Sequence, residues 1–532
     1  MSLFKNKLTF ILLYTVLAFT VIYVMTSGGL GISVDSENYL NIAHRFTEHL
    51  WGKAFNPVWP PAYPLSIAAI KALGLAELAG AAQAVSIISF VILVVTVFLL
   101  GLRLQGKLTA HFSAISTIFF ASLIYIYCYA WSETLYIMFS TLFFLTLILF
   151  FKAPPEKMTK YLIGSGIFAG LGTISRLIGF SLIGTGILSI LFLSDYHPKS
   201  KRIKKTLVFM FVSGIPVLFH YLTCFYYYGL RGKTQWPSKY SFSHQLSQFF
   251  FTIYHDFLSF DLSFWKYVFL FGSGFPLFWV RAFVLLCSLI LLIFFFKLAF
   301  FARLPKEVYK FPIIVIFYLV LYSSIILLVS TTIAVDPIGS RFTSPLYPLF
   351  LLLAFSLVFQ VCNSFTQQKI KRLLWVIVIF GTVSFWAIQI TSSLSIYKGI
   401  RSGSFPTMEQ PGNLNRGSIT FLKENVDSSD MIITNIYRKL DLLWPRREPY
   451  PDIPKEDWEK NLKAVTYEAS QRTVYILICS EDFAPYGITV EDMDTTNEKI
   501  GLFSWKKNFG NDYVYKTKHV IFQKPPEMKK EE

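Results

Sequence analysis

Long apolar runs dominate the first three quarters of the chain, and polar residues fall mainly in the gaps between them. Many of these runs are close to 20 residues long, which an α-helix needs to cross about 30 Å of hydrocarbon. The pattern predicts about eleven transmembrane helices, at 8–27, 81–101, 109–130, 133–151, 161–175, 178–194, 206–228, 277–300, 312–332, 343–362 and 372–394. We therefore predict a mainly α fold, a polytopic helical membrane domain.

The composition agrees with this interpretation. Of the 532 residues, 54% are hydrophobic and only 15% are charged, whereas a soluble domain has about 25% charged residues. The first run is too long for a signal-peptide core, and no small-residue cleavage site follows it, so we expect a retained span. Four of the five cysteines lie in predicted spans and Cys479 stands alone, which argues against disulfides and thiolate metal sites.

The distribution of Lys and Arg predicts the orientation. Basic residues gather in alternate short loops, and the positive-inside rule then places the N-terminus in the cytoplasm. An odd number of spans places the C-terminal part outside the cytoplasmic (inner) membrane. The net charge of +17 comes largely from the cytoplasmic rim, so it predicts contact with anionic membrane lipids and no nucleic-acid binding.

The last part of the chain is more polar and has a different pattern. Helix-like stretches at 414–425 and 455–470 alternate with strand-like stretches at 431–434, 473–479 and 519–523. We predict two domains, a transmembrane domain at 1–396 and a small α/β extracytoplasmic domain at 397–532.

Acidic residues at the outer surface are the first candidates for chemistry. Asp35 and Glu37 follow the first predicted span, and Glu133 opens another. A carboxylate at a membrane surface must be solvated, paired or functional. The structural alternatives are a helix cap for Asp35 and a favourable interaction with the helix dipole for Glu133.

Two arginines are predicted on the same outer side. Arg176 lies at the tip of a hairpin between 161–175 and 178–194, whose flanks are both basic and therefore cytoplasmic. Arg341 opens the span at 343–362, where it could anchor the interface or bind a lipid phosphate through its forked donors. The glycines before Arg176 indicate tight helix packing rather than phosphate binding, because no strand precedes them: Gly164, Gly166, Gly170 and Gly172.

The sequence gives no signal for a cofactor. It contains no P-loop and no Rossmann fingerprint followed by an acidic residue, so a reactive donor would have to come from the membrane. His44 and Glu48 are one helical turn apart, but two ligands do not make a metal site. We predict no cofactor and no metal.

Several short motifs share this outer side and occur in a characteristic order. They are Asp35-x-x-x-Tyr39 with Ala43, Pro60-Pro61-x-Tyr63-Pro64, Ser132-Glu133, Ser175-Arg176-x-x-Gly179 and Arg341-Phe-x-x-Pro345-x-x-Pro348. With these motifs the chain resembles the GT-C superfamily of polyprenyl-phosphate-sugar-dependent glycosyltransferases, in particular bacterial members akin to protein O-mannosyltransferases and aminoarabinose transferases. The resemblance covers most of the membrane region.

The resemblance implies an inverting hexosyl- or pentosyltransferase at the outer face of the membrane. Its donor would be a polyprenyl-phosphate sugar, and its acceptor a lipid, glycan or protein. Asp35 would be the base, with Glu37 and Glu133 as further catalytic candidates. The substrate would be bound by Tyr39, Tyr63, Arg176 and Arg341. Many relatives have two adjacent acidic residues, whereas here Ser36 follows Asp35, so the sequence leaves open whether Glu37 replaces the second acid.

Three alternatives remain open from the sequence. An oligosaccharide transferase or ligase with a pyrophosphate-linked carrier would be favoured by metal dependence. A non-enzymatic lipid or glycan transporter should show an inverted repeat and charges near mid-membrane, and neither is evident. A family member without activity could also act as a scaffold.

Overall fold

The structure, a computed structural model, divides into two compact units. One unit comprises residues 1–31 and 42–406, and the other comprises 32–41 and 407–532. The described residues are 2–74, 76–194, 199–229, 238, 240–258, 306–332, 338–365, 367–401, 421–422, 424–426, 431–434, 474–479, 503–509 and 512–517. The predicted domain boundary at 396 stays a prediction.

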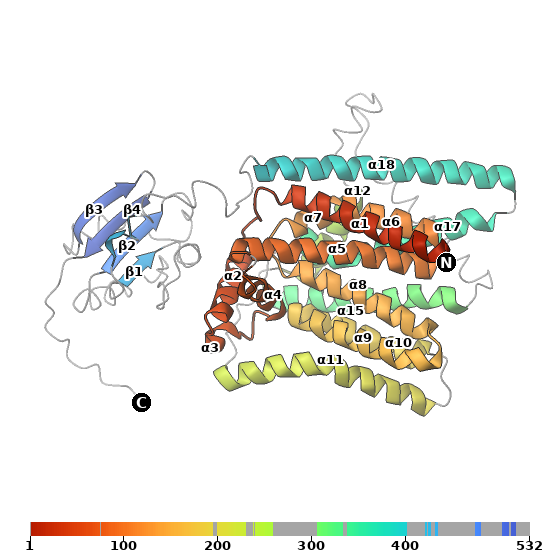
Figure 1. Cartoon of the computed structure of the whole chain (residues 1–532), viewed down its shortest axis with the longest axis horizontal. Coiled ribbons are helices and arrows are strands. Elements are labelled where there is room, and N and C mark those ends of the chain that lie inside the picture. The colour runs from red at the N-terminus through yellow and green to blue at the C-terminus, as the bar shows by residue number, and fades with distance from the viewer. Residues whose placement is uncertain are drawn as a thin grey trace, which may run out of the picture. The chain divides into compact units, whose positions relative to one another are not determined.

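The first unit is helical, and Figure 1 shows its long helices running alongside one another. Its elements are α1 (Ser2–Met25), the second part of α2 (Val34–Thr47) from residue 42 onward, α3 (Trp51–Ala54), α4 (Ala62–Ala72), α5 (Leu78–Leu104), α6 (Lys107–Phe119), α7 (Ala121–Tyr127), α8 (Glu133–Lys152), α9 (Pro155–Ser175), η1 (Leu177–Gly179), α10 (Phe180–Leu193), α11 (Lys199–Tyr228), α12 (Phe242–Leu258), α15 (Lys306–Thr332), α16 (Ser340–Thr343), η2 (Ser344–Leu346), α17 (Tyr347–Ser364) and α18 (Gln368–Arg401).

The predicted polytopic helical membrane fold is confirmed. Among the described residues, seven helices are long and apolar enough to cross a membrane, or up to eight if α6 and α7 count as one bent span. The predicted spans at 161–175 and 178–194 are helices α9 and α10, although they do not meet this criterion of length and apolarity. The span predicted at 277–300 lies outside the described residues, and the count of eleven stays a prediction.

One predicted span is broken. The run at 109–130 forms α6 and α7, which are bent by 56°, with Phe120 in extended conformation between them. A break inside a membrane leaves backbone groups that water cannot satisfy. Here the Ala121 N–H donates to the Gln389 side chain of α18, at 2.8 Å.

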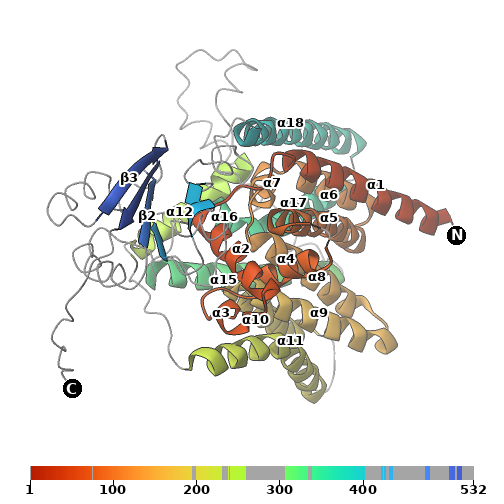
Figure 2. The ribbon, with the colours of Figure 1, turned by 60° about the vertical axis from the view of Figure 1, so that its left-hand side comes forward.

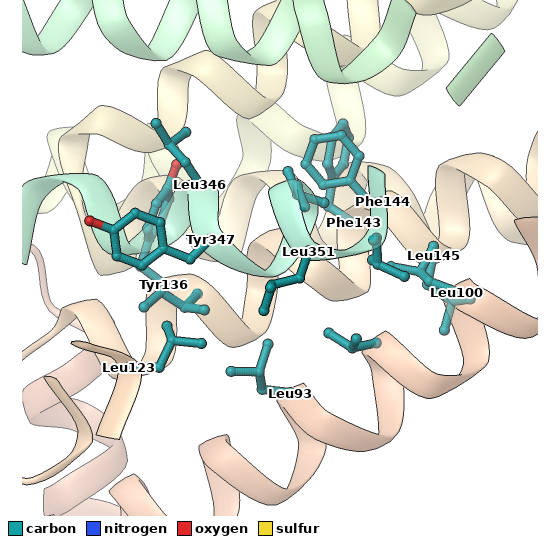
Figure 3. Close-up of a cluster of buried hydrophobic side chains, with 14 of the residues drawn as sticks. Leu93, Leu100, Leu123, Tyr136, Phe143, Phe144, Leu145, Leu346, Tyr347 and Leu351 are labelled. Carbon is teal, nitrogen blue, oxygen red and sulfur yellow. The ribbon is translucent and has the colours of Figure 1, made fainter. Parts of the chain in front are cut away.

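The core lies between α5, α8 and α17. Figure 3 shows the side chains of Leu93, Leu100, Phe144 and Leu351 among those that point into it, and each of these four is at most 3% exposed. Lipid tails are as apolar as leucine, so burial of apolar area does not by itself hold such helices together. Close packing of side chains supplies much of the attraction.

Three of the four glycines before Arg176 lie at tight contacts, as predicted, whereas a Cβ on Gly164 would meet nothing nearer than 3.5 Å. A Cβ on Gly170 would come within 2.6 Å of the Ser213 carbonyl oxygen on α11, and one on Gly166 within 2.9 Å of Val212. Any larger residue would push α9 and α11 apart.

The two views agree that α18 and α11 lie at opposite edges of the helical unit (Figures 1 and 2). The short helices α3 and α4 lie at the end of the long helices where α1 ends (Figure 1). Large apolar side chains are exposed along α11 and α18, including Phe211, Phe219 and Phe380. In a multi-pass membrane protein such faces meet lipid.

The second unit contains a four-stranded sheet in the order β1-β2-β4-β3. Its strands are β1 (Met431–Thr434), β2 (Val474–Cys479), β3 (Phe503–Phe509) and β4 (Asp512–Thr517). β1 pairs with β2 in parallel, and the other pairs are antiparallel. The sequence predicted β1 and β2, whereas β3 and β4 were missed. The strand predicted at 519–523 and the helix at 455–470 lie outside the described residues.

Candidate active site

The site is centred on Glu133, the first residue of α8. Its side chain is 0% exposed, and its position at a helix N-terminus suits a negative charge. A buried carboxylate is tolerated only when it is well paired. The residues that pair with it therefore decide what this group can do.

Arg176 and Arg341 both pair with this carboxylate. Arg341 donates through Nε to Oε1 and through Nη2 to Oε2, the latter at 3.5 Å, while Arg176 pairs with Oε1 through Nη1. The two arginine side chains are 18% and 16% exposed, respectively, for Arg176 and Arg341. The structure thus brings together three of the seven predicted site residues, from segments far apart in the sequence.

Short, irregular elements present the two arginines. Arg176 is the extended residue after α9, before the 3₁₀ turn η1. Arg341 lies on the four-residue helix α16, which leads through η2 into α17. Aromatic rings flank both guanidinium groups, with Arg341 4.7 Å from the ring centre of Trp131 and Arg176 5.7 Å from that of Phe342. Such cation–π contacts fix the orientation of an arginine.

Trp131 lies in the loop between α7 and α8, and its ring is supported by other residues of that loop. The rings of Tyr129 and Trp131 stack at 4.3 Å. A parallel bridge joins Gly31 to Tyr129, in which the Gly31 N–H donates to Cys128 O at 2.7 Å and the Ala130 N–H to Gly31 O at 3.3 Å. A Cβ on Gly31 would lie 2.5 Å from the Tyr129 ring, so the close approach requires glycine.

A second buried carboxylate, Asp256 on α12, lies next to the segment that carries Arg341. It is 4% exposed, accepts a hydrogen bond from Ser340 at 2.9 Å and accepts another from the Tyr347 hydroxyl. Its hydrogen bond with His255 raises the pKa of that imidazole. Asp256 was not among the predicted site residues, although it is the single acid of an aromatic-rich helix.

Three predicted site residues lie in the second unit, at the start of α2. Asp35 and Glu37 are in the first turn of the helix, and Tyr39 is buried. The capping position belongs to Ser33, whose hydroxyl accepts from the Ser36 N–H at 3.3 Å. Asp35 is half-buried and is a first-turn acid rather than the cap, so capping does not account for its presence.

The remaining predicted residue, Tyr63, is fully buried in α4. Sequence reasoning also missed Trp131 and Phe342, the rings beside the two arginines. Within the described part of the chain, no group of three His, Cys, Asp or Glu side chains could hold a metal ion.

The helical fold places this chain among the multi-pass membrane proteins. Its architecture is shared by the solved structures described below. The sequence matches no known family profile, and it matches none of the curated proteins.

The similarity is seen in solved structures. ArnT from Cupriavidus metallidurans in the apo state has a TM-score of 0.61 at 12% identity, over 97% of this chain and 99% of that one. The same protein bound to undecaprenyl phosphate gives 0.60 at 11% identity, over 97% and 99%. The oligosaccharyltransferase AglB from Archaeoglobus fulgidus, in complex with an inhibitory peptide and a dolichol-phosphate, gives 0.53 at 12% identity, over 89% and 69%. At these identities the likeness establishes the fold.

Proposed function

We propose that this protein is an integral membrane glycosyltransferase that transfers a sugar from a polyprenyl-phosphate donor to a lipid, glycan or protein acceptor. The observation that carries the proposal is the convergence of Arg176 and Arg341 on the buried Glu133. Guanidinium groups bind phosphate oxygens through paired donors, and they remain charged at any physiological pH. A pair of them, held by one carboxylate, keeps a net positive charge for a phosphate.

The solved structures support this assignment. ArnT was observed with undecaprenyl phosphate, and AglB with a dolichol-phosphate. Both ligands are phosphates of long isoprenoid alcohols. A chain with the same fold and an arginine pair can hold such a lipid with its tail in the membrane and its phosphate at the arginines.

In the proposed reaction, the acceptor hydroxyl or amine attacks the anomeric carbon from the face opposite the phosphate. Asp35 takes the acceptor proton as general base. The bond between the anomeric carbon and the phosphate oxygen breaks, and polyprenyl phosphate leaves with its additional negative charge. Arg176 and Arg341 stabilise that charge, and inversion at the anomeric carbon follows from the direction of attack.

Glu133 has a different role in this scheme from that of a base. Both of its carboxylate oxygens already accept from arginines, and its side chain is fully buried. We assign it the task of orienting the two guanidinium groups. Glu37 is then the acid next in line to Asp35. The site faces the outside of the cytoplasmic membrane in this proposal, with the N-terminus inside.

The test is transfer from a panel of radiolabelled polyprenyl-phosphate sugars by the purified protein in detergent. We expect transfer or hydrolysis of one donor. Asp35→Asn should reduce the rate by about 10²–10⁴-fold without changing the melting temperature, and Glu37→Gln should have a smaller effect. Full activity of Asp35→Asn would remove it from the role of base. Activity only with a pyrophosphate-linked donor and an added metal would instead favour an oligosaccharide transferase, the activity named for AglB.

A further inference from the structure

The helix α12 has an unusual buried face. Gln245, Phe249, Thr252 and Asp256 follow the spacing of one side of a helix, and all four are at most 7% exposed. Three of these four are polar. On the opposite side, Phe250 and Phe251 are 63% and 51% exposed. A helix that buries its polar side chains needs polar partners for them inside the protein.

Those polar groups belong to the segment that leads into Arg341. The Ile338 N–H donates to Gln245 Oε1 at 3.1 Å, and the Thr252 hydroxyl donates to Ile338 O at 3.1 Å. Two residues further on, Ser340 donates to Asp256 at 2.9 Å. Both backbone groups of Ile338 and the side chain of Ser340 are therefore held by α12.

The element that carries Arg341 has little means of holding itself in place. α16 has four residues, and a helix of this length is not stable on its own. Besides the pairing of Arg341 with Glu133, α16 is held at the Phe342 carbonyl, which accepts from the Tyr322 hydroxyl at 2.6 Å. Asp256 also fixes the chain after the arginine, because it accepts a hydrogen bond from the Tyr347 hydroxyl at the start of α17.

We propose that α12 is the element that positions Arg341, with Gln245 and Thr252 fixing the segment before the arginine and Asp256 acting as the positioning residue on either side of it. Asp256 touches no reacting atom in this arrangement. Its effect on catalysis passes through the placement of the guanidinium group. That α12 positions Arg341 follows from the structure, whereas the effect of this positioning on turnover rests on the proposed function.

The alternative is that the polar face of α12 is merely structural. A displacement of about 1 Å in a group that stabilises the transition state can reduce the rate by about 10²-fold. A purely structural defect would also reduce activity, through the amount of folded protein. The two explanations differ in whether the effect depends on Arg341.

The first measurement needs no enzymatic assay. Hydrogen exchange is followed in the full-length protein for the peptide around Ile338, in Gln245→Leu and in its matched control Gln248→Leu. Gln248 lies on the same helix and is half-exposed. We expect exchange to accelerate about 2- to 10-fold in Gln245→Leu, the effect of one lost hydrogen bond, and to remain unchanged in the control. Equal exchange in the two variants would overturn the proposal.

The second measurement is a double-mutant cycle, with turnover measured on the donor that the panel of polyprenyl-phosphate sugars identifies. Asp256→Ala should reduce turnover about 10²-fold, and Ser340→Ala, which removes only one partner of Asp256, should reproduce part of this loss. In an Arg341→Ala background both substitutions should have no further effect, because the group that they position is absent. A full additional loss in that background would show an independent structural role and refute the inference. If the wild type transfers no sugar from any donor, the proposed function fails, and the exchange rates still decide whether α12 holds this segment.

Discussion

Replacing Glu133 by glutamine is the most direct test of the arginine pair. The substitution keeps the size of the side chain and removes its charge. The amide oxygen can still accept from one arginine, but the amide NH₂ group then points its hydrogens toward the other. The two guanidinium groups, which already lie close together in the wild type, lose their common counter-ion.

The magnitude follows from the burial of the three groups. Breaking a buried ion pair on one side costs about 3–5 kcal/mol. The arginine side chains keep 18% and 16% of their exposure, so water screens them in part, and we expect a value near the lower end, about 3 kcal/mol. At about 2 °C per kcal/mol, as for a large domain, the melting temperature should fall by about 6 °C.

The assay is thermal unfolding of the purified protein in detergent, with Glu77→Gln as the matched control. Glu77 is 93% exposed and lies 3.8 Å from Lys71, and an exposed pair of this kind contributes little. Adding undecaprenyl phosphate should stabilise Glu133→Gln more than the wild type, because the phosphate then binds arginines that no carboxylate occupies. If Glu133→Gln and Glu77→Gln melt at the same temperature, Glu133 does not hold the two arginines, and the reasoning fails.

Three further predictions concern the arginine, its support and the topology. Arg341→Ala should weaken donor use in the transfer assay by about 10²-fold, and Arg341→Lys should restore only part of it because lysine lacks the fork; full recovery with lysine would exclude a forked contact. Gly31→Ala should reduce donor binding severalfold, since its Cβ would displace the Tyr129 ring that lies beneath Trp131, whereas Gly381→Ala, with no atom within 4 Å, should bind donor like the wild type; equal binding by the two variants would count against the stacked support. A reporter fused after Lys398 should be external and one after Lys204 cytoplasmic, and two fusions on the same side would refute the orientation.

The long helices could be predicted from the sequence because apolar length alone determines them. The break at Phe120 could not, because the partner of the Ala121 N–H lies 268 residues away in the sequence. No local pattern encodes such a contact. A prediction from apolar runs therefore joined α6 and α7 into one span.

The site shows the same division between local and distant information. The motifs placed Arg176 and Arg341 on a common side, and Glu133 was recognised as a candidate. Their pairing depends on how α8, α9 and α16 pack, which the sequence does not display. The hairpin of β3 and β4 was missed despite a local signal, since Gly510 and Asn511 separate the two strands and Gly-Asn is a common two-residue hairpin connection.

The weak attachment of α18 has a consequence for biogenesis. Only 11% of its most apolar window is buried, yet Gln389 donates to the Asp256 carbonyl at 3.2 Å and Trp386 to Ser116 at 2.8 Å. α18 emerges from the ribosome after the other described helices of the membrane unit, and its Gln389 remains costly in lipid until these partners accept it. The polar side chain of Gln389 therefore disfavours insertion of α18 into the bilayer but favours its later packing against the other helices. Gln389→Leu would favour entry of α18 into the bilayer while removing the contact that joins it to α7 and α12, so the cell would accumulate an inserted but incompletely assembled chain.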